Sequence, residues 1–330
     1  SIERYPLAWD KRDIDTALAS WHTHEFDQPW THHSWTLTLR RAGHIPGAAM
    51  LEIETPNHRV LLTGDFDTRD SPLVKGAEPI KTDILFVEGT YGGRDHPETD
   101  VEVERFITSV AEVVKRGGTV LIPAFANGRT QDVVMLLHRH LPHLDVHVDG
   151  MGKRIAKMQM EHPEALREPN DLEAAWRWCR RVSSKSDKKK ALEADVIVTT
   201  SGMLEGGPVL EYFRNIAPHT KNKILFVSYQ VNGTLGRRVM DGARQVSILG
   251  RDGKIEVVSI NCSTERLDGF SGHSDYNQLM SFVHRLRPKL RRVLVNHGER
   301  KKSENLSMSI RRMYKVSSHY PQVQEAIKLF

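Results

Sequence analysis

Hydrophobic residues before Gly92-Gly93 come in short runs, several of which alternate with polar residues and stop at a glycine or an acidic residue. A period of two is typical of half-buried strands, and turn residues of this kind bound them. The pattern predicts strands at residues 35–39, 48–54, 59–63 and 84–87. Asp10 can cap a helix that runs to about residue 20. The first part of the chain is therefore expected to be rich in strands.

After Gly93, longer amphipathic segments alternate with short apolar runs. This alternation predicts an α/β region with a mostly parallel sheet. Its helices are expected at residues 99–116, 129–140 and 209–216, with further helical stretches up to about 181. Its strands are expected at residues 119–123, 146–148, 196–199 and 224–229. The basic run at residues 185–190 is predicted to be a flexible loop.

The last part of the chain returns to mixed patterns. Residues 245–249 and 254–259 flank Arg251-Asp252-Gly253 and predict a hairpin, because Asp-Gly favours a tight turn. A helix at 276–286, a strand at 292–295 and a helix at 304–315 are expected to close the chain. Its 330 residues exceed the size at which one hydrophobic core stops growing, so two lobes are expected.

Composition narrows the class of protein. No apolar run approaches the roughly 20 residues that a bilayer span needs, and the first six residues lack the features of a signal peptide. A cytoplasmic protein without a membrane partner is expected. Cys179 and Cys262 are the two cysteines, too few for a disulfide framework or a cysteine-rich zinc site. Any metal must therefore be bound by histidines and carboxylates.

The net charge of +5 is a mild bias toward polyanions, and the distribution of basic residues is more informative. They cluster at 180–190, at Arg237-Arg238 and at 285–292. Each cluster, taken alone, fits a solvated surface as well as it fits a phosphate-binding surface.

Five predicted strand ends or turns carry a histidine or an acidic residue next to glycine. They are His44, Asp65, Glu88, His273 and His297. Any one of them could be an ordinary capped turn with a satisfied polar residue. Together they indicate a sheet edge that presents ligands to a shared site, in which one aspartate, with two oxygens, could bridge two cations.

With these residues the chain resembles the β-CASP family of metallo-β-lactamase nucleases, most closely its archaeal cleavage-factor type. Gly43-His44 and Gly64-Asp65 match metal ligands of the superfamily, and Glu88, His273 and His297 match the three motifs that the family adds. Two intervening stretches, 122–131 and 201–208, are also similar. The resemblance implies an αββα metallo-β-lactamase core from residues 1–93 and 271–330, with an α/β β-CASP domain, residues 94–270, inserted into it.

The resemblance also implies a zinc-dependent ribonuclease with two zinc ions. His44 would bind one zinc, Asp65 would bridge both, and His297 would bind the other. His273 would be the general acid, and Glu88 would fix its tautomer. Substrate contacts are expected at Arg129, Ser201, Gly202, Met203, Ser271 and Ser274, and at Lys188, Lys189 and Lys190 of the basic run.

Single-stranded RNA is the expected substrate, for 3′-end processing or decay, and endonuclease and 5′-to-3′ exonuclease action share this chemistry. A homodimer formed through the C-terminal region, including 326–330, and subunits of an RNA-processing complex are further expected partners. Two alternatives stay open: a DNA nuclease of the same family, and a catalytically silent scaffold subunit of an RNA-processing complex. DNA-repair members of the family usually carry valine at the position of His297, and silent scaffold subunits tend to lose the motifs that are intact here.

One family motif is missing. The family's His-x-His-x-Asp-His signature supplies four positions of the metal site and does not occur in this sequence. Trp21-His22-Thr23-His24-Glu25-Phe26-Asp27 is similar but places the aspartate one position late, so the histidines of this region are interpreted as surface residues. They are His22, His24, His32 and His33. We expect the signature to precede Ser1 in the natural protein.

Overall fold

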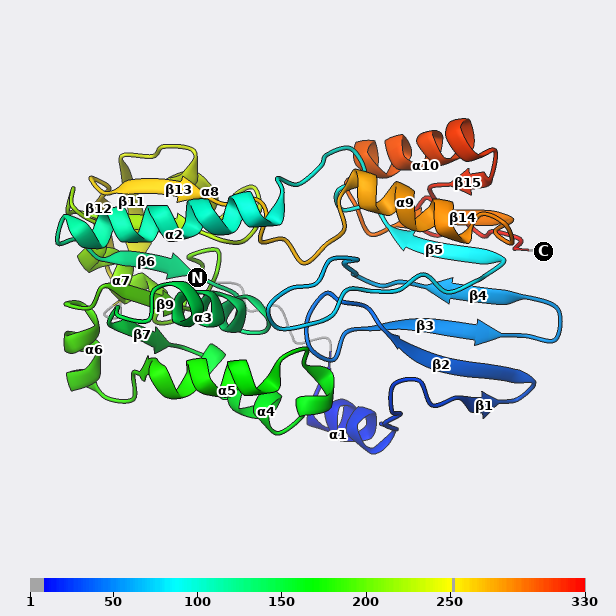
Figure 1. Cartoon of the computed structure of the whole chain (residues 1–330), viewed down its shortest axis with the longest axis horizontal. Coiled ribbons are helices and arrows are strands. Elements are labelled where there is room, and N and C mark those ends of the chain that lie inside the picture. The colour runs from blue at the N-terminus through cyan, green and yellow to red at the C-terminus, as the bar shows by residue number, and fades with distance from the viewer. Residues whose placement is uncertain (1–8, 251–252, 330) are drawn as a thin grey trace.

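A computed structural model describes residues 9–250 and 253–329, which form two lobes, each built on one large sheet (Figure 1). The first lobe, called the core lobe, contains a seven-stranded sheet in the order β1-β2-β3-β4-β5-β14-β15. Its strands are β1 (Trp30–His32), β2 (Trp35–Arg41), β3 (Ala49–Glu54), β4 (Arg59–Leu62), β5 (Ile84–Glu88), β14 (Arg292–Asn296) and β15 (Ser317–His319). Strands β1 to β4 are antiparallel, and β4, β5, β14 and β15 are parallel.

Helices α9 (Tyr276–Leu286) and α10 (Arg300–Tyr314) cover one face of this sheet. Leu61 and Leu85 on the sheet pack there with Phe282 and Ile310 on the helices, and all four are buried. The opposite face carries apolar residues that are only half-buried, among them Leu37, Leu39, Leu51, Ile53, Leu62 and Phe86. Helix α1 (Lys11–Ala19), which Asp10 caps as predicted, has no buried residue. The described residues thus show one helix-covered sheet of the predicted core.

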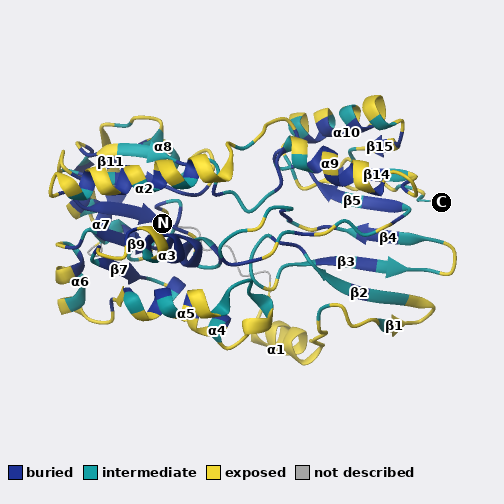
Figure 2. Ribbon diagram, viewed as in Figure 1, coloured by how far each residue is buried: buried dark blue, intermediate teal, exposed yellow. Residues whose placement is uncertain are grey.

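The second lobe, called the parallel lobe, has six strands in the order β13-β10-β6-β9-β7-β8, all parallel. They are β6 (Val120–Pro123), β7 (Val146–Asp149), β8 (Arg180–Arg181), β9 (Val196–Thr199), β10 (Lys223–Phe226) and β13 (Ser263–Arg266). Strands β6, β7 and β9 are buried along their whole length, as expected for a sheet covered on both faces (Figure 2).

Two apolar clusters fill the two faces of this sheet. One packs against α2 (Thr99–Lys115), α3 (Arg129–His140), α4 (Gly152–Met160) and α5 (Pro169–Trp178). The other packs against α6 (Lys185–Ala191), α7 (Val209–Ile216), α8 (Leu235–Met240) and the hairpin of β11 (Gln245–Leu249) and β12 (Ile255–Ser259). A short 3-10 helix, Pro163–Ala165, connects α4 to α5. The predicted α/β class is confirmed, whereas the domain limits 1–93, 94–270 and 271–330 stay predictions.

Several predicted elements need correction. The basic run at 185–190 is helix α6, not a flexible loop, because Ser184 and Asp187 form a capping box at its start. The predicted helix up to 181 ends at Trp178, and the strand β8 that follows pairs with β7. Strand β10 ends at Phe226, and β1 and β13 were not predicted. The predicted turn residues Arg251 and Asp252 lie outside the described residues.

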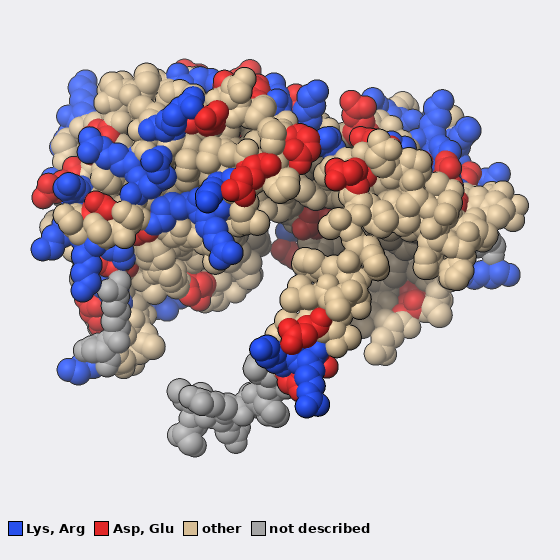
Figure 3. Space-filling model, turned by 90° about the horizontal axis from the view of Figure 1, so that it is seen from below, with Lys and Arg blue, Asp and Glu red and all other residues tan. Residues whose placement is uncertain are grey.

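Charge is distributed unevenly over the two lobes. Lys and Arg gather on the parallel lobe, at the left, whereas the side of the core lobe turned to the viewer carries few of either sign (Figure 3). In the part of the chain that the structure describes, no helix combines the length and apolar character that crossing a bilayer requires.

Candidate metal centre and cleft

The parallel strands of the core lobe bring the predicted site residues to one edge. Asp65 follows β4 within three residues, Glu88 is the last residue of β5, and His297 follows β14 directly. Because β4, β5 and β14 are parallel neighbours, their carboxyl ends lie at the same edge. The turns that contain His44 and His273 meet there, since the ring centroids of the two histidines are 4.6 Å apart.

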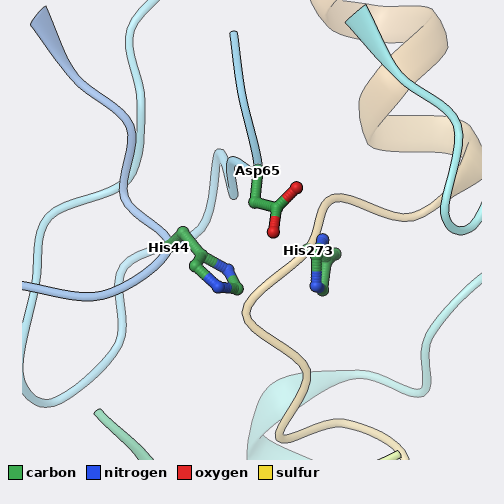
Figure 4. A group of neighbouring side chains, drawn as sticks. All are labelled: His44, Asp65 and His273. Atoms are coloured by element: carbon green, nitrogen blue, oxygen red, sulfur yellow. The ribbon is translucent and has the colours of Figure 1, made fainter. Parts of the chain in front are cut away.

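Asp65 lies at the centre of this group. Ligand atoms of His44, Asp65 and His273 lie within 4.8 Å of one another, and their side chains point to a common space (Figure 4). The same holds for Asp65, Glu88 and His297. Asp65 is the residue common to both groups, the position that a bridging carboxylate would occupy.

His44 is held as metal-binding histidines usually are. Its Nδ1–H donates to the carbonyl oxygen of Gly272 at 2.6 Å, which leaves Nε2 unprotonated and available as a ligand. Burial lowers the pKa of His44, and this favours the neutral form that binds metal. A Cβ atom at Gly272 would lie 3.0 Å from Nδ1 of His44, so glycine permits this close approach.

His273 has a different partner. Its Nδ1 lies 2.8 and 2.9 Å from the two carboxylate oxygens of Glu88, which is 1% exposed. The backbone N–H of Phe66 donates to Oε1 of Glu88 at 2.8 Å and fixes the carboxylate in turn. Burial acts to lower the pKa of His273, but the hydrogen bond and the charge of Glu88 outweigh it, so the pKa is raised. This pair keeps a proton on Nδ1 and favours a protonated ring.

His297 lies on the open side of the site. Its Nδ1 is 2.9 Å from Oδ1 of Asp65, and its side chain is 62% exposed. The imidazole of His297 therefore lies beside the carboxylate that the two candidate ligand groups share.

A cavity of about 530 Å³ adjoins these residues and separates the two lobes. The core lobe contributes His44, His273 and His297 to its lining. The parallel lobe contributes loops that follow its strands and carry Phe125, Asn127, Arg129, Ser228 and Tyr229. The cavity is therefore a cleft between the lobes with the candidate metal ligands on one wall.

The residues expected to contact substrate occupy different positions. Arg129 and Ser271 line the cleft, and Arg129 also pairs with Asp132 at 3.0 Å. Ser274 is fully buried and accepts a hydrogen bond from the N–H of Thr68.

Ser201, Gly202 and Met203 do not line this cleft. The carbonyl oxygen of Gly202 accepts from Gln230, that of Met203 accepts from the N–H of Gly236, and the hydroxyl of Ser201 accepts from the N–H of Glu205. These three residues hold neighbouring loops together.

The three lysines of the basic run lie on α6, at the end of the parallel lobe that is remote from the core lobe (Figure 1). Lys188 binds Glu211 at 2.7 Å, whereas Lys189 and Lys190 are exposed. Their predicted contact with phosphate stays a prediction, and it would lie outside the cleft.

Some residues of the site were not predicted. Arg69 pairs with Asp67 and donates to the carbonyl oxygen of Ser271 at 3.0 Å, so it supports the turn that carries His273. His96 Nε2 lies 3.0 Å from the carbonyl oxygen of His273 and supports the same turn from the other side. The sequence offered one signal for the Arg69–Asp67 pair, because Asp67 follows Asp65 by two residues. It offered no signal for His96.

A sheet edge that gathers histidines around a central carboxylate, next to a second α/β lobe, is the arrangement expected of a metal site of the metallo-β-lactamase type. The sequence profile of the Beta-Casp domain matches residues 130–239, and that of the Zn-dependent metallo-hydrolase RNA specificity domain matches residues 257–321. The chain belongs to the β-CASP family of metallo-β-lactamase nucleases.

Its relatives include archaeal proteins named transcription termination factor FttA. The protein of Cenarchaeum symbiosum is 48% identical, over 89% of this chain and 49% of the relative. Those of Thermococcus kodakarensis and Methanocaldococcus jannaschii are 36% and 34% identical, over 89% of this chain and 48% and 50% of the relatives. The chain spans about half the length of the curated relatives it matches.

Proposed function

We propose that this protein is a zinc-dependent ribonuclease that hydrolyses phosphodiester bonds of single-stranded RNA in the cleft between its lobes. The observation that carries the proposal is the arrangement around Asp65: two candidate ligand groups share this carboxylate, and His273 of one group is hydrogen-bonded to Glu88 of the other. The name of the relatives supports a role in ending or processing transcripts. Endonuclease and 5′-to-3′ exonuclease action are both compatible with the cleft.

The donor set fits zinc. Imidazole nitrogen and carboxylate oxygen are its usual ligands when thiolates are lacking, and both described cysteines are buried without a disulfide. His44 and His297 would each bind one ion, and Asp65 would bridge them. Two four-coordinate ions need more donors than these three side chains offer, so further ligands must complete the site. When bound, zinc supplies Lewis acidity that activates water and offsets charge on the phosphate.

His273 acts as the general acid. Glu88 holds Nδ1, so the proton on Nε2 of the imidazolium is available to the leaving oxygen of the RNA. The raised pKa keeps a larger fraction of the ring protonated near neutral pH. Arg129 and Ser271 bind the substrate from opposite walls of the cleft.

Two histidine substitutions test this assignment. His273→Ala should lower RNA cleavage by roughly 10²–10⁴, the usual contribution of general acid catalysis, with zinc content unchanged. His297→Ala should lose zinc and activity together. The exposed His219, on a loop of the parallel lobe, gives a matched control whose alanine variant should keep both. Loss of zinc from His273→Ala, or cleavage at the wild-type rate, would show that the roles are misassigned.

Asp65→Ala tests the bridging role. Elemental analysis of the natural full-length protein should find about two zinc ions per chain and a larger loss in Asp65→Ala than in His44→Ala, because the bridge serves both ions. Equal zinc in wild type and Asp65→Ala would refute the bridge. Matched RNA and DNA strands decide between the substrate classes, and preferential cutting of DNA would favour the DNA-nuclease alternative.

Two partner proposals rest on the sequence resemblance. Strand β15 forms one edge of the seven-stranded sheet, and a strand edge can pair with a second chain, which supports the proposed homodimer through the C-terminal region. Association with subunits of an RNA-processing complex is a proposal of the same kind.

A further inference from the structure

We infer that Phe125 and Tyr229 form a stacking platform for two unpaired bases of the RNA, on the wall of the cleft that faces the candidate metal ligands. This inference rests on the proposed function, because it assigns a role in substrate binding to residues of the same cleft. It goes further by assigning recognition of bases, not of phosphate, to the parallel lobe.

The exposure of these two rings is the first observation. Five aromatic residues stand out as exposed in the described part of the chain, and three of them, Trp9, Trp21 and Trp35, precede β3. The other two, Phe125 and Tyr229, are 40% and 38% exposed and line the cleft. Aromatic rings that stay accessible in a cleft offer flat apolar faces to a ligand.

The sheet places the two loops that carry these rings beside each other. Phe125 follows the end of β6 by two residues, and Tyr229 follows the end of β10 by three. Strands β6 and β10 are parallel neighbours, with Val120 opposite Lys223, and neighbouring strands lie about 4.8 Å apart. The strand order also reverses beside β6, and ligands of open α/β sheets bind at the carboxyl ends of strands at such a point.

Both rings are held in place before any ligand binds. A Cβ atom at Gly202 would lie 3.3 Å from Cδ1 of Phe125, so this ring packs directly against the Gly202 backbone. Gln230 fixes Gly202 in turn, by donating to its carbonyl oxygen at 2.9 Å. The hydroxyl of Tyr229 reaches across to a carboxylate oxygen of Glu299 at 3.5 Å. Rings that are already ordered lose little conformational entropy when a base stacks on them.

A polar group beside the rings lacks a hydrogen-bond partner among the residues that the structure describes. Ser228 lines the same cleft and is 8% exposed, and its buried hydroxyl makes no hydrogen bond within the described residues. An unsatisfied buried hydroxyl costs free energy, and this one lies in the wall of the cleft next to Tyr229.

This platform selects single strands. Bases in a duplex are already stacked and paired, whereas unpaired bases can turn onto aromatic side chains. Stacking is tolerant of sequence, because every base has a π face. The platform therefore requires two accessible bases near the scissile phosphate and tolerates any sequence.

Abasic RNA tests the inference directly. A short single-stranded RNA is prepared with one abasic nucleotide at each position in turn, and its affinity is measured with the zinc-loaded protein. At two positions we expect the loss of the base to weaken binding by roughly 5- to 150-fold, the usual contribution of one stacked base. Abasic sites elsewhere should change affinity little.

Protein variants complete a double-mutant cycle. Phe125→Leu and Tyr229→Leu keep apolar volume but lose the flat ring, so each should weaken binding of intact RNA and become insensitive to the abasic site at its own position. Phe125→Trp and Tyr229→Phe keep an aromatic ring and should retain the sensitivity to the abasic site. Tyr229→Phe also removes the hydroxyl that contacts Glu299, so it distinguishes the effect of the ring from that of this hydrogen bond. Trp35→Leu, an exposed aromatic outside the cleft, is the matched control.

The outcomes separate the inference from the proposed function. If the leucine variants keep the wild-type sensitivity to abasic sites, or if no abasic site weakens binding, the platform is refuted even though RNA is cut. If the abasic pattern depends on both rings but no RNA is cleaved by the zinc-loaded protein, the platform stands and the ribonuclease proposal fails.

Discussion

Glu88→Gln separates the role of the His273–Glu88 pair from that of the metal ligands. Glutamine keeps the shape of the side chain and its carbonyl oxygen can still accept from the N–H of Phe66. Glutamine has no negative charge, and its NH2 group cannot accept from Nδ1–H of His273, so the imidazolium loses the carboxylate that stabilises it. Glu88 is 1% exposed, so solvent does not screen the loss of its negative charge.

The expected magnitude follows from this geometry. A hydrogen bond to a charged group contributes about 1.5–3 kcal/mol, which corresponds to roughly 10- to 150-fold in cleavage rate at neutral pH. Glu88 raises the pKa of His273, so its removal lowers that pKa and the acid form is lost at a lower pH. The ratio of wild-type to variant rates should therefore shrink as the pH falls, because His273 becomes protonated in both proteins.

The assay measures cleavage of labelled RNA between acidic and mildly alkaline pH, together with zinc content. Glu112→Gln, on the exposed face of α2, is the matched control and should match wild type in both. A variant that loses zinc would identify Glu88 as a metal ligand, which its proximity to Asp65 and His297 makes a real alternative. A rate ratio that is constant with pH would refute the proposed link to the protonation of His273.

Three further predictions concern the scaffold around the site. Gly272→Ala should release zinc to a chelator faster than wild type, with the fold intact, because a Cβ atom there would lie 2.9 Å from the carbonyl oxygen of His44; unchanged release would refute this constraint. Burial acts to raise the pKa of Glu265, but hydrogen bonds from Lys223 and Ser109 lower it. Glu265→Gln should therefore reduce the urea midpoint at pH 7, and the difference should begin to shrink as the pH falls through the ordinary glutamate value of about 4.3 and vanish once the folded-state carboxylate is protonated too. Replacing Lys188, Lys189 and Lys190 together with alanine should weaken RNA binding and flatten its salt dependence if α6 contacts phosphate outside the cleft; an unchanged slope would identify the run as a solvated surface.

The sequence indicated the candidate centre well because its residues lie at the ends of parallel strands. Asp65, Glu88 and His297 each follow an apolar run, and parallel neighbours must end at one edge of a sheet. Local signals could also have corrected one error. Ser184 and Asp187 have the spacing of a capping box, and this predicts a helix over the following basic residues.

Contacts between distant segments could not be predicted in the same way. The bond from His44 to the Gly272 carbonyl oxygen joins residues 228 positions apart, and it decides which ring nitrogen faces the site. The division of roles between His273 and His297 likewise depends on which histidine meets Glu88 and which meets Asp65. The family resemblance suggested these roles, but neither local pattern distinguishes them.

The sequence by itself determined the α/β class, the strand ends that carry histidines and carboxylates, and the family, because these depend on local periodicity and on motifs. Only the tertiary structure decided that Phe125 and Tyr229 stay exposed in the cleft while the lysines of α6 lie far from it. The hydrophobic pattern places an aromatic residue in a core by default. The order of β6 and β10 in the sheet, and the way the second lobe faces the first, turn these two rings toward the candidate centre.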